Sequence, residues 1–109
     1  MDITFINDKM KRLSENHRVA ERQFGAACAR KLRVRLADLE AAATVSDLVA
    51  GRPHPLKGDR QGQFAVDLAG GIRLVFEPNH NPCPRLDSKA IDWPRVTRIR
   101  IVFIGDYHG

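Results

Sequence analysis

The segment Asp106-Tyr107-His108-Gly109 carries adjacent side chains that could take part in proton transfer. It follows an apolar run over residues 99–104 that is typical of a β-strand. Unpaired polar groups are costly to bury, so we expect these side chains at a sheet edge or in a cleft. Histidine exchanges a proton near neutral pH, and a neighbouring Asp or Tyr can orient or tune it. A frayed and solvated chain end is the alternative interpretation.

A second group of titratable residues lies in Pro53-His54-Pro55-Leu56-Lys57-Gly58-Asp59-Arg60. The flanking prolines restrict the backbone around His54, and Gly58 permits a tight turn beside Lys57. His54 as an ordinary loop residue and Lys57 as a solvated turn residue are the alternative interpretations.

Arg73 lies inside a predicted strand, between Ile72 and Leu74, and alternation places it on the opposite face from both neighbours. A half-buried arginine needs an anion. That anion is either a ligand or a carboxylate of the protein, for which Asp67 and Glu77 are the candidates.

Two histidines, a lysine, an arginine and a tyrosine together suit ribonucleolytic chemistry. A base takes the proton of the 2′-hydroxyl, cations stabilise the charge of the phosphorane, and an acid protonates the leaving 5′-oxygen. The sequence has no set of Asp and Glu residues of the kind that holds Mg²⁺. We therefore expect a reaction that needs neither metal nor cofactor.

These residues must be positioned by the elements around them. A strand is predicted over residues 2–6 and a short basic helix over residues 9–13, whereas residues 14–23 are ambiguous. The clearest helix covers residues 26–43, where apolar residues recur at helical steps, namely Cys28, Leu32, Leu36, Leu39 and Ala43. A capping-box pattern at Thr44-Val45-Ser46-Asp47 predicts one more turn, which Gly51-Arg52-Pro53 ends.

The second half of the chain has the period of strands. Strands are predicted over residues 63–68, 72–77 and 96–105, with a hairpin turn at Gly70-Gly71 and an irregular loop over residues 78–94. We expect Trp93 to pin that loop onto the body. Strands joined in this way are antiparallel neighbours. The sequence thus predicts one α+β domain over residues 1–109, a small antiparallel sheet with N-terminal helices packed on one face.

The composition favours a polyanionic partner. The 109 residues include 18 Lys and Arg against 13 Asp and Glu, which gives a formal net charge of +5. Four of these cations lie within six residues, Arg30, Lys31, Arg33 and Arg35, and form either an RNA-binding surface or a solvated helix face. Cys28 and Cys83 lack metal-site spacing, and Cys28 is expected to be a reduced core thiol. No signal peptide or membrane-spanning run is visible, so we expect a cytoplasmic protein with no membrane partner.

Three motifs, in this order, resemble the RelE/ParE superfamily of bacterial type II toxins and in particular its HigB-like branch. They are His54-Pro55-Leu56-Lys57-Gly58, Ile72-Arg73-Leu74-Val75-Phe76 and Asp106-Tyr107-His108. The resemblance implies a small microbial-ribonuclease-like fold and cleavage of mRNA on the translating ribosome. It also implies neutralisation by a helix-turn-helix, HigA-like antitoxin, through which alone the toxin would meet operator DNA.

The resemblance further implies which residues act. The catalytic residues would be His54, Asp106, Tyr107 and His108, while Lys57 and Arg73 would bind the substrate phosphate. The chain departs from the family pattern in its long 78–94 segment, which would either cap the site or contact a partner. Two alternatives remain open: a ParE-like inhibitor of DNA gyrase, whose class lacks this His-rich set, and a non-toxic basic binding module.

Overall fold

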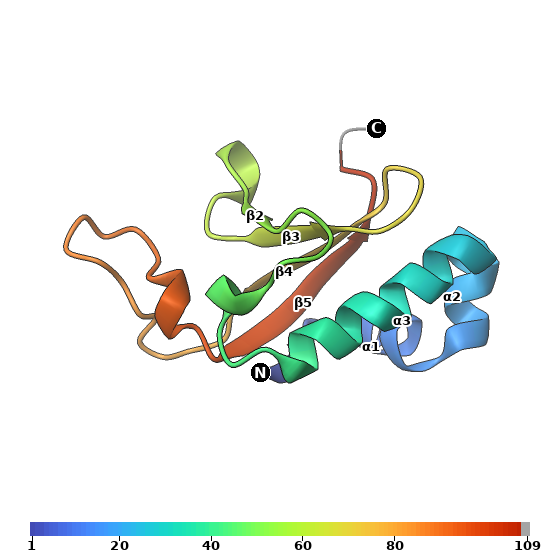
Figure 1. The fold of residues 1–109 in the computed structure, drawn as a ribbon, viewed down its shortest axis with the longest axis horizontal. Coiled ribbons are helices and arrows are strands. Elements are labelled where there is room, and N and C mark those ends of the chain that lie inside the picture. The colour runs from blue at the N-terminus through green and yellow to red at the C-terminus, as the bar shows by residue number, and fades with distance from the viewer. Residues whose placement is uncertain (108–109) are drawn as a thin grey trace.

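The computed structural model describes residues 1–107, which form three α-helices and a five-stranded sheet (Figure 1). The helices are α1 (Asp8–Glu15), α2 (His17–Phe24) and α3 (Ala26–Ala41). The strands are β1 (Asp2–Phe5), β2 (His54–Pro55), β3 (Phe64–Asp67), β4 (Arg73–Pro78) and β5 (Arg98–Gly105). Single 3₁₀ turns cover Val45–Asp47, Gly58–Arg60 and Trp93–Arg95. The predicted α+β class is confirmed.

Asparagine caps divide the N-terminal helices. The Asn7 side chain accepts a hydrogen bond from the Met10 N–H at the start of α1, and the Asn16 side chain does the same for two N–H groups of α2. Gly25 has a φ of +87° and separates α2 from α3, a conformation that a residue with a Cβ rarely adopts. The ambiguous segment 14–23 is therefore mostly helix α2. None of the described helices is long and apolar enough to cross a membrane.

The strand order is β1-β5-β4-β3-β2, and the sheet is mixed. The predicted antiparallel pairing of β3 with β4 and of β4 with β5 is confirmed. The expectation of an entirely antiparallel sheet is wrong, because β1 pairs in parallel with β5, Ile3 opposite Ile99. A hairpin fixes the direction of its two strands, whereas β1 reaches β5 only through the rest of the chain, so its direction has no local signal.

The short strand β2 was not expected. It pairs antiparallel with β3, His54 opposite Ala65, at the edge of the sheet. Proline is tolerated in an edge strand, where its missing N–H faces away from the ladder. His54 is thus part of the sheet rather than a loop residue.

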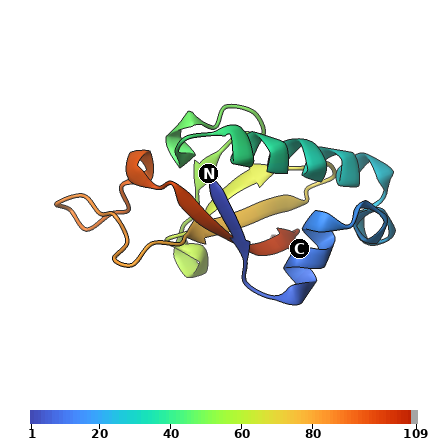
Figure 2. The ribbon, with the colours of Figure 1, turned by 90° about the horizontal axis from the view of Figure 1, so that it is seen from below.

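The core lies between the helices and one face of the sheet, along which α3 extends (Figure 2). Leu32 and Leu39 of α3 are buried with Leu74, Phe76 and Ile101 of the sheet. A β-bulge interrupts β5, where the register passes from Phe76 opposite Ile101 to Val75 opposite Phe103. The bulge lets Ile101 and Ile104 both face the core and turns Phe103 to the opposite face.

The 78–94 segment is attached to the body at both ends. His80 Nε2 accepts hydrogen bonds from the backbone N–H groups of Thr97 and Arg98, at 3.1 and 3.2 Å. The Trp93 ring packs edge-on against Phe64, with ring centroids 4.9 Å apart. The prediction that Trp93 pins this segment is confirmed.

Thiol reagents should distinguish the two cysteines. Cys28 is 4% exposed, and burial raises the pKa of its thiol above the ordinary value, although a hydrogen bond with the Ala69 backbone acts in the opposite direction. Cys83 is partly exposed and also free. We expect N-ethylmaleimide to modify Cys83 at least about tenfold faster in the folded protein, because the thiolate is the reacting species. Timed alkylation followed by mass spectrometry measures both rates, and a Cys83→Ser variant that still reacts quickly would contradict the burial of Cys28.

Candidate functional site

A row of paired residues crosses the sheet on the face turned away from the helices. The register places His54 opposite Ala65, Ala65 opposite Val75, and Val75 opposite Phe103. Directly paired residues point to the same face, so four strands contribute one side chain each to this row. Ala65 and Val75 are short and fully buried, and neither belongs to the helix-side core. His54 and Phe103, at the two ends of the row, are partly exposed.

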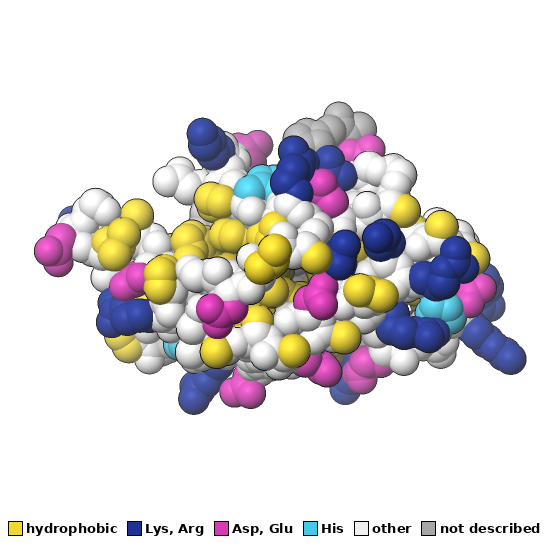
Figure 3. Space-filling model, in the orientation of Figure 1, with side chains coloured by type: hydrophobic (Ala, Val, Ile, Leu, Met, Phe, Trp, Pro, Cys, Tyr) yellow, Lys and Arg dark blue, Asp and Glu magenta, His cyan; other side chains and the backbone are white. Residues whose placement is uncertain are grey.

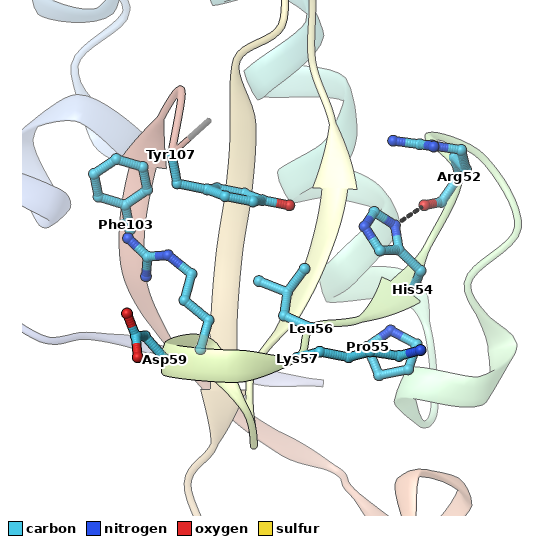
Figure 4. A pocket seen from close by; sticks show the side chains of 9 residues that line it. Arg52, His54, Pro55, Leu56, Lys57, Asp59, Phe103 and Tyr107 are labelled. Carbon is cyan, nitrogen blue, oxygen red and sulfur yellow. Dashed lines mark hydrogen bonds between the residues drawn. The ribbon is translucent and has the colours of Figure 1, made fainter. Parts of the chain in front are cut away.

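An open cleft of about 960 Å³ is lined by the two end residues of this row, His54 and Phe103 (Figure 4). Its charged residues are mostly cations, with only one carboxylate among them. The lining consists of Arg52, His54, Pro55, Leu56, Lys57, Asp59, Arg60, Phe103 and Tyr107. The cleft therefore suits an anionic ligand that also offers an apolar surface.

The imidazole of His54 is held in one tautomer. Its Nδ1 lies 2.7 Å from the carbonyl oxygen of Arg52, and since a carbonyl can only accept, Nδ1 carries the hydrogen. In the neutral ring Nε2 then keeps its lone pair and can act as a base. Arg52 has a φ of +49°, a strained conformation for a residue with a Cβ, and this turn presents its carbonyl to the ring.

Arg60 places a cation in the cleft between two aromatic rings. Its guanidinium carbon lies 4.5 Å from the centroid of the Phe103 ring and 5.3 Å from that of Tyr107. Arg60 Nη1 donates a hydrogen bond to Gln63 Oε1 at 3.0 Å, which fixes the group further. Cation–π contacts of this kind hold a guanidinium without neutralising it. The charge of Arg60 thus remains available to a ligand.

Tyr107 and Lys57 are two further site residues predicted from the sequence, and both line the cleft. The Tyr107 ring extends into the cleft with its hydroxyl directed across it, toward the side on which His54 lies (Figure 4). Lys57 is exposed and forms no ion pair within the described residues. Three of the predicted site residues, His54, Lys57 and Tyr107, therefore line one cleft.

Two further candidates lie outside the cleft lining. Arg73 Nε is 2.7 Å from Asp67 Oδ1, and Asp67 Oδ2 is 3.0 Å from Arg52 Nε, so one carboxylate joins both arginines. The sequence left a ligand, Asp67 or Glu77 as the anion for Arg73, and the structure shows Asp67 in this role. Asp106 lies beside the hairpin turn, where a Cβ on Gly71 would be 3.5 Å from its Oδ2. His108 falls outside the described residues.

The four cations of α3 do not form one free surface. Arg30, Lys31 and Arg33 are exposed, but the Arg35 side chain is 12% exposed, pairs with Asp38 at 3.1 Å and packs against Gly51. The reason is helical geometry, because position 35 lies close to the buried stripe, so that the arginine stem packs along the core. Lys and Arg are dense around α2 and the start of α3 (Figure 3).

Sequence reasoning missed Arg60 and Phe103 as members of the site. Arg60 belongs to the segment with His54, but its position depends on Phe103, which is distant in the chain. Phe103 itself faces the cleft only because of the bulge in β5. No group of three or more His, Cys, Asp or Glu within residues 1–107 could hold a metal ion.

The comparisons with known proteins place the fold. No protein-family model matches the chain, and no curated protein does. Among solved structures, a YoeB/ParE toxin from Agrobacterium tumefaciens superposes with a TM-score of 0.60 at 14% identity, covering 98% of this chain and 99% of that one. A YoeB–YefM complex from Staphylococcus aureus gives a TM-score of 0.58 at 17% identity, covering 98% and 97%. The chain therefore has the fold of the YoeB/ParE toxins.

The close approach of Phe103 to Gly105 generates a stability prediction. A Cβ on Gly105 would lie 2.7 Å from the Phe103 ring, so Gly105→Ala must displace the ring that supports Arg60. We expect the free energy of unfolding to fall by about 1–3 kcal/mol, as for other overpacked sites. Urea denaturation measures it. In a Phe103→Leu background the same change should cost clearly less, and a full cost there would contradict the contact.

Proposed function

We propose that this chain is a toxin of a bacterial type II toxin–antitoxin system that cleaves mRNA on the ribosome. The observation that carries the proposal is His54, whose Nδ1 is fixed by the Arg52 carbonyl and whose ring lines a cationic cleft together with Tyr107. The shared fold supports a toxin role. The three sequence motifs support assignment to the HigB-like branch.

In the proposed reaction His54 Nε2 takes the proton of the 2′-hydroxyl, and the 2′-oxygen attacks the adjacent phosphorus. The bond from phosphorus to the 5′-oxygen breaks, and an acid gives that oxygen a proton. The products are a 2′,3′-cyclic phosphate and a 5′-hydroxyl, so the step needs neither water nor metal. Tyr107 and His108 are the proposed proton donors, and Asp106 is the proposed group that tunes them.

Lys57 and Arg60 are the proposed cations that stabilise the negative charge of the phosphorane. Both belong to the cleft lining, and neither pairs with a carboxylate among the described residues. Cations fixed in advance stabilise developing charge without reorganising during the reaction. We propose Arg60 for the role that the motif resemblance gave to Arg73, because Arg73 is occupied by Asp67.

The proposed partners follow from charge and from the resemblance. Arg30, Lys31 and Arg33 of α3 would contact ribosomal RNA, and a helix-turn-helix antitoxin would neutralise the toxin and alone connect it to operator DNA. The S. aureus neighbour is a YoeB–YefM complex, which supports a dedicated protein partner here as well. The setting of this reaction would be the cytoplasm.

Removing the proposed base should abolish toxicity without unfolding the protein. We expect His54→Ala to slow mRNA cleavage by roughly a hundredfold or more, the usual contribution of a positioned base. Cleavage ends are mapped by primer extension on purified translating ribosomes. His17→Ala is a matched control, because His17 is a partly exposed histidine of α2 that pairs with Glu21. Full cleavage by His54→Ala would refute the role of His54 as the base. Absence of cleavage by the parent would refute the nuclease, and growth inhibition without mRNA cleavage would favour a ParE-like gyrase inhibitor.

The hydroxyl and the ring of Tyr107 should have separable effects. Tyr107→Phe keeps the ring near Arg60 and removes only the hydroxyl, so we expect slower cleavage with an unchanged melting temperature. Deletion of residues 107–109 removes the ring as well and should abolish growth inhibition at a small cost in stability. Circular dichroism melts accompany both assays. A folded deletion variant that still cleaves mRNA would show that the tail takes no part in the chemistry.

A further inference from the structure

A second hollow of about 590 Å³ adjoins the cleft. Both are lined by Pro55 and Leu56, which therefore form a ridge between them. One wall of this hollow comes from the turn after β2 and the other from the 78–94 segment. Its remaining lining residues are Gln61, Gly62, Gln63, Arg85, Lys89, Ala90, Ile91 and Trp93, and we refer to it as the side groove.

The outer wall of the side groove is ordered by a β-bridge and by hydrogen bonds within the 78–94 segment. Arg85 forms a β-bridge with Ile91, and the Leu86 N–H donates to the Ala90 carbonyl at 2.8 Å. Arg95 adds a hydrogen bond from Nη2 to the Arg85 carbonyl at 3.2 Å. The segment projects beyond the sheet (Figure 1), and Leu86 near its tip is 51% exposed. A wall ordered in advance adds little entropic cost when a ligand binds.

The cations of the side groove are not neutralised by the protein. Within the described residues neither Arg85 nor Lys89 forms an ion pair. Arg85 Nη1 donates a hydrogen bond to the Lys89 carbonyl at 2.8 Å, which holds the guanidinium without neutralising it. The arginines of β4 and β5 differ, since Arg73, Arg98 and Arg100 each lie within 4 Å of a carboxylate. Unpaired cations therefore line both the cleft and the groove beside it.

One side chain links the two hollows. Gln63 lines the side groove, and its Oε1 accepts the hydrogen bond from Arg60 in the cleft. The amide nitrogen of Gln63 is a further hydrogen-bond donor. Trp93, held edge-on against Phe64, contributes aromatic surface to the same groove.

We propose that the side groove binds the nucleotides of a single-stranded RNA that flank the bond cut in the cleft. Arg85 and Lys89 bind backbone phosphates, Trp93 and Ile91 present apolar surface to a base, and the glutamine amides hydrogen-bond base edges. Cations, an aromatic surface and amide groups are the usual parts of single-stranded RNA sites. The assignment of these nucleotides to a cleaved strand rests on the proposed function, whereas RNA binding in the groove does not.

An acidic peptide is the competing occupant, since it would also pair with Arg85 and Lys89. RNA is favoured by the shared ridge, because a strand lying over Pro55 and Leu56 meets unpaired cations in both hollows. The amides of Gln61 and Gln63 also match base edges, which offer both donors and acceptors.

Trp93 is the only tryptophan of the chain, so its fluorescence reports on the groove directly. The full chain is titrated with 2′-O-methyl RNAs of three and eight nucleotides, which cannot be cleaved, and with an octamer of glutamate. We expect the RNA octamer to bind more tightly than the trimer and to change Trp93 emission. The glutamate octamer should leave the emission unchanged.

The double variant Arg85→Gln/Lys89→Gly removes both cations, and glycine suits the φ of +72° at position 89. We expect about tenfold weaker octamer binding, unchanged trimer binding, and a salt slope smaller by about 1.4, at about 0.7 for each lost phosphate contact. Lys89→Gly alone keeps Arg85 and should lose about half of that slope. Arg18→Gln/Arg22→Gln on α2 removes the same charge elsewhere and should keep the length dependence.

Wild-type octamer affinity in both groove variants would overturn the proposal, as would Trp93 emission that responds to the glutamate octamer and not to RNA. Melting temperatures near that of the parent show that the variants are folded. Failure of the proposed nuclease is seen separately, as absence of ribosomal mRNA cleavage by the parent. If the parent does not cleave mRNA but still binds RNA in a length-dependent way, the proposal that the side groove binds RNA stands and only the proposed nuclease activity is refuted.

Discussion

The register of the central strands determines where every other functional group lies. Side chains alternate between the two faces of a sheet, so a slip of one residue in β4 or β5 would exchange the cleft face for the core face. Leu74, Phe76 and Ile101 are fully buried against the helices, and burial of each such side chain contributes about 1.5–3 kcal/mol. The apolar core thereby fixes the register, and with it the positions of His54 and Phe103 on the opposite face.

Carboxylates on the sheet separate structural cations from available ones. Asp67 joins Arg52 to Arg73, and this pairing helps to hold the strained turn whose carbonyl orients His54. Lys57 and Arg60 have no such carboxylate among the described residues and face the cleft. An unpaired charge near the surface gives up stabilisation that an ion pair would supply, and it gains interaction with an anionic ligand instead. The difference between cations paired with carboxylates and unpaired cations therefore locates the candidate site better than the net charge of the chain does.

The sequence predicted the features that local patterns encode. Helical spacing located α3, and the Gly70-Gly71 turn located the β3–β4 hairpin. The motif around His54 and the C-terminal motif supplied His54, Lys57 and Tyr107, which line one cleft. Features that depend on residues distant in the chain were not predicted. The parallel pairing of β1 and the bulge that exposes Phe103 arise from tertiary contacts that leave no period in the chain.

Arg60 connects the two parts of the chain that form the cleft. The strand β2 has only two residues, so the turn after it needs other support. The hydrogen bond to Gln63 ties Arg60 to the start of β3, while Phe103 and Tyr107 tie it to the end of β5. Arg60 thus contacts the Tyr107 ring and also keeps a positive charge that an anionic ligand can bind. Through Arg60, ligand binding is coupled to the ordering of the cleft residues. Binding of an anion at Arg60 should therefore stabilise both walls of the cleft together.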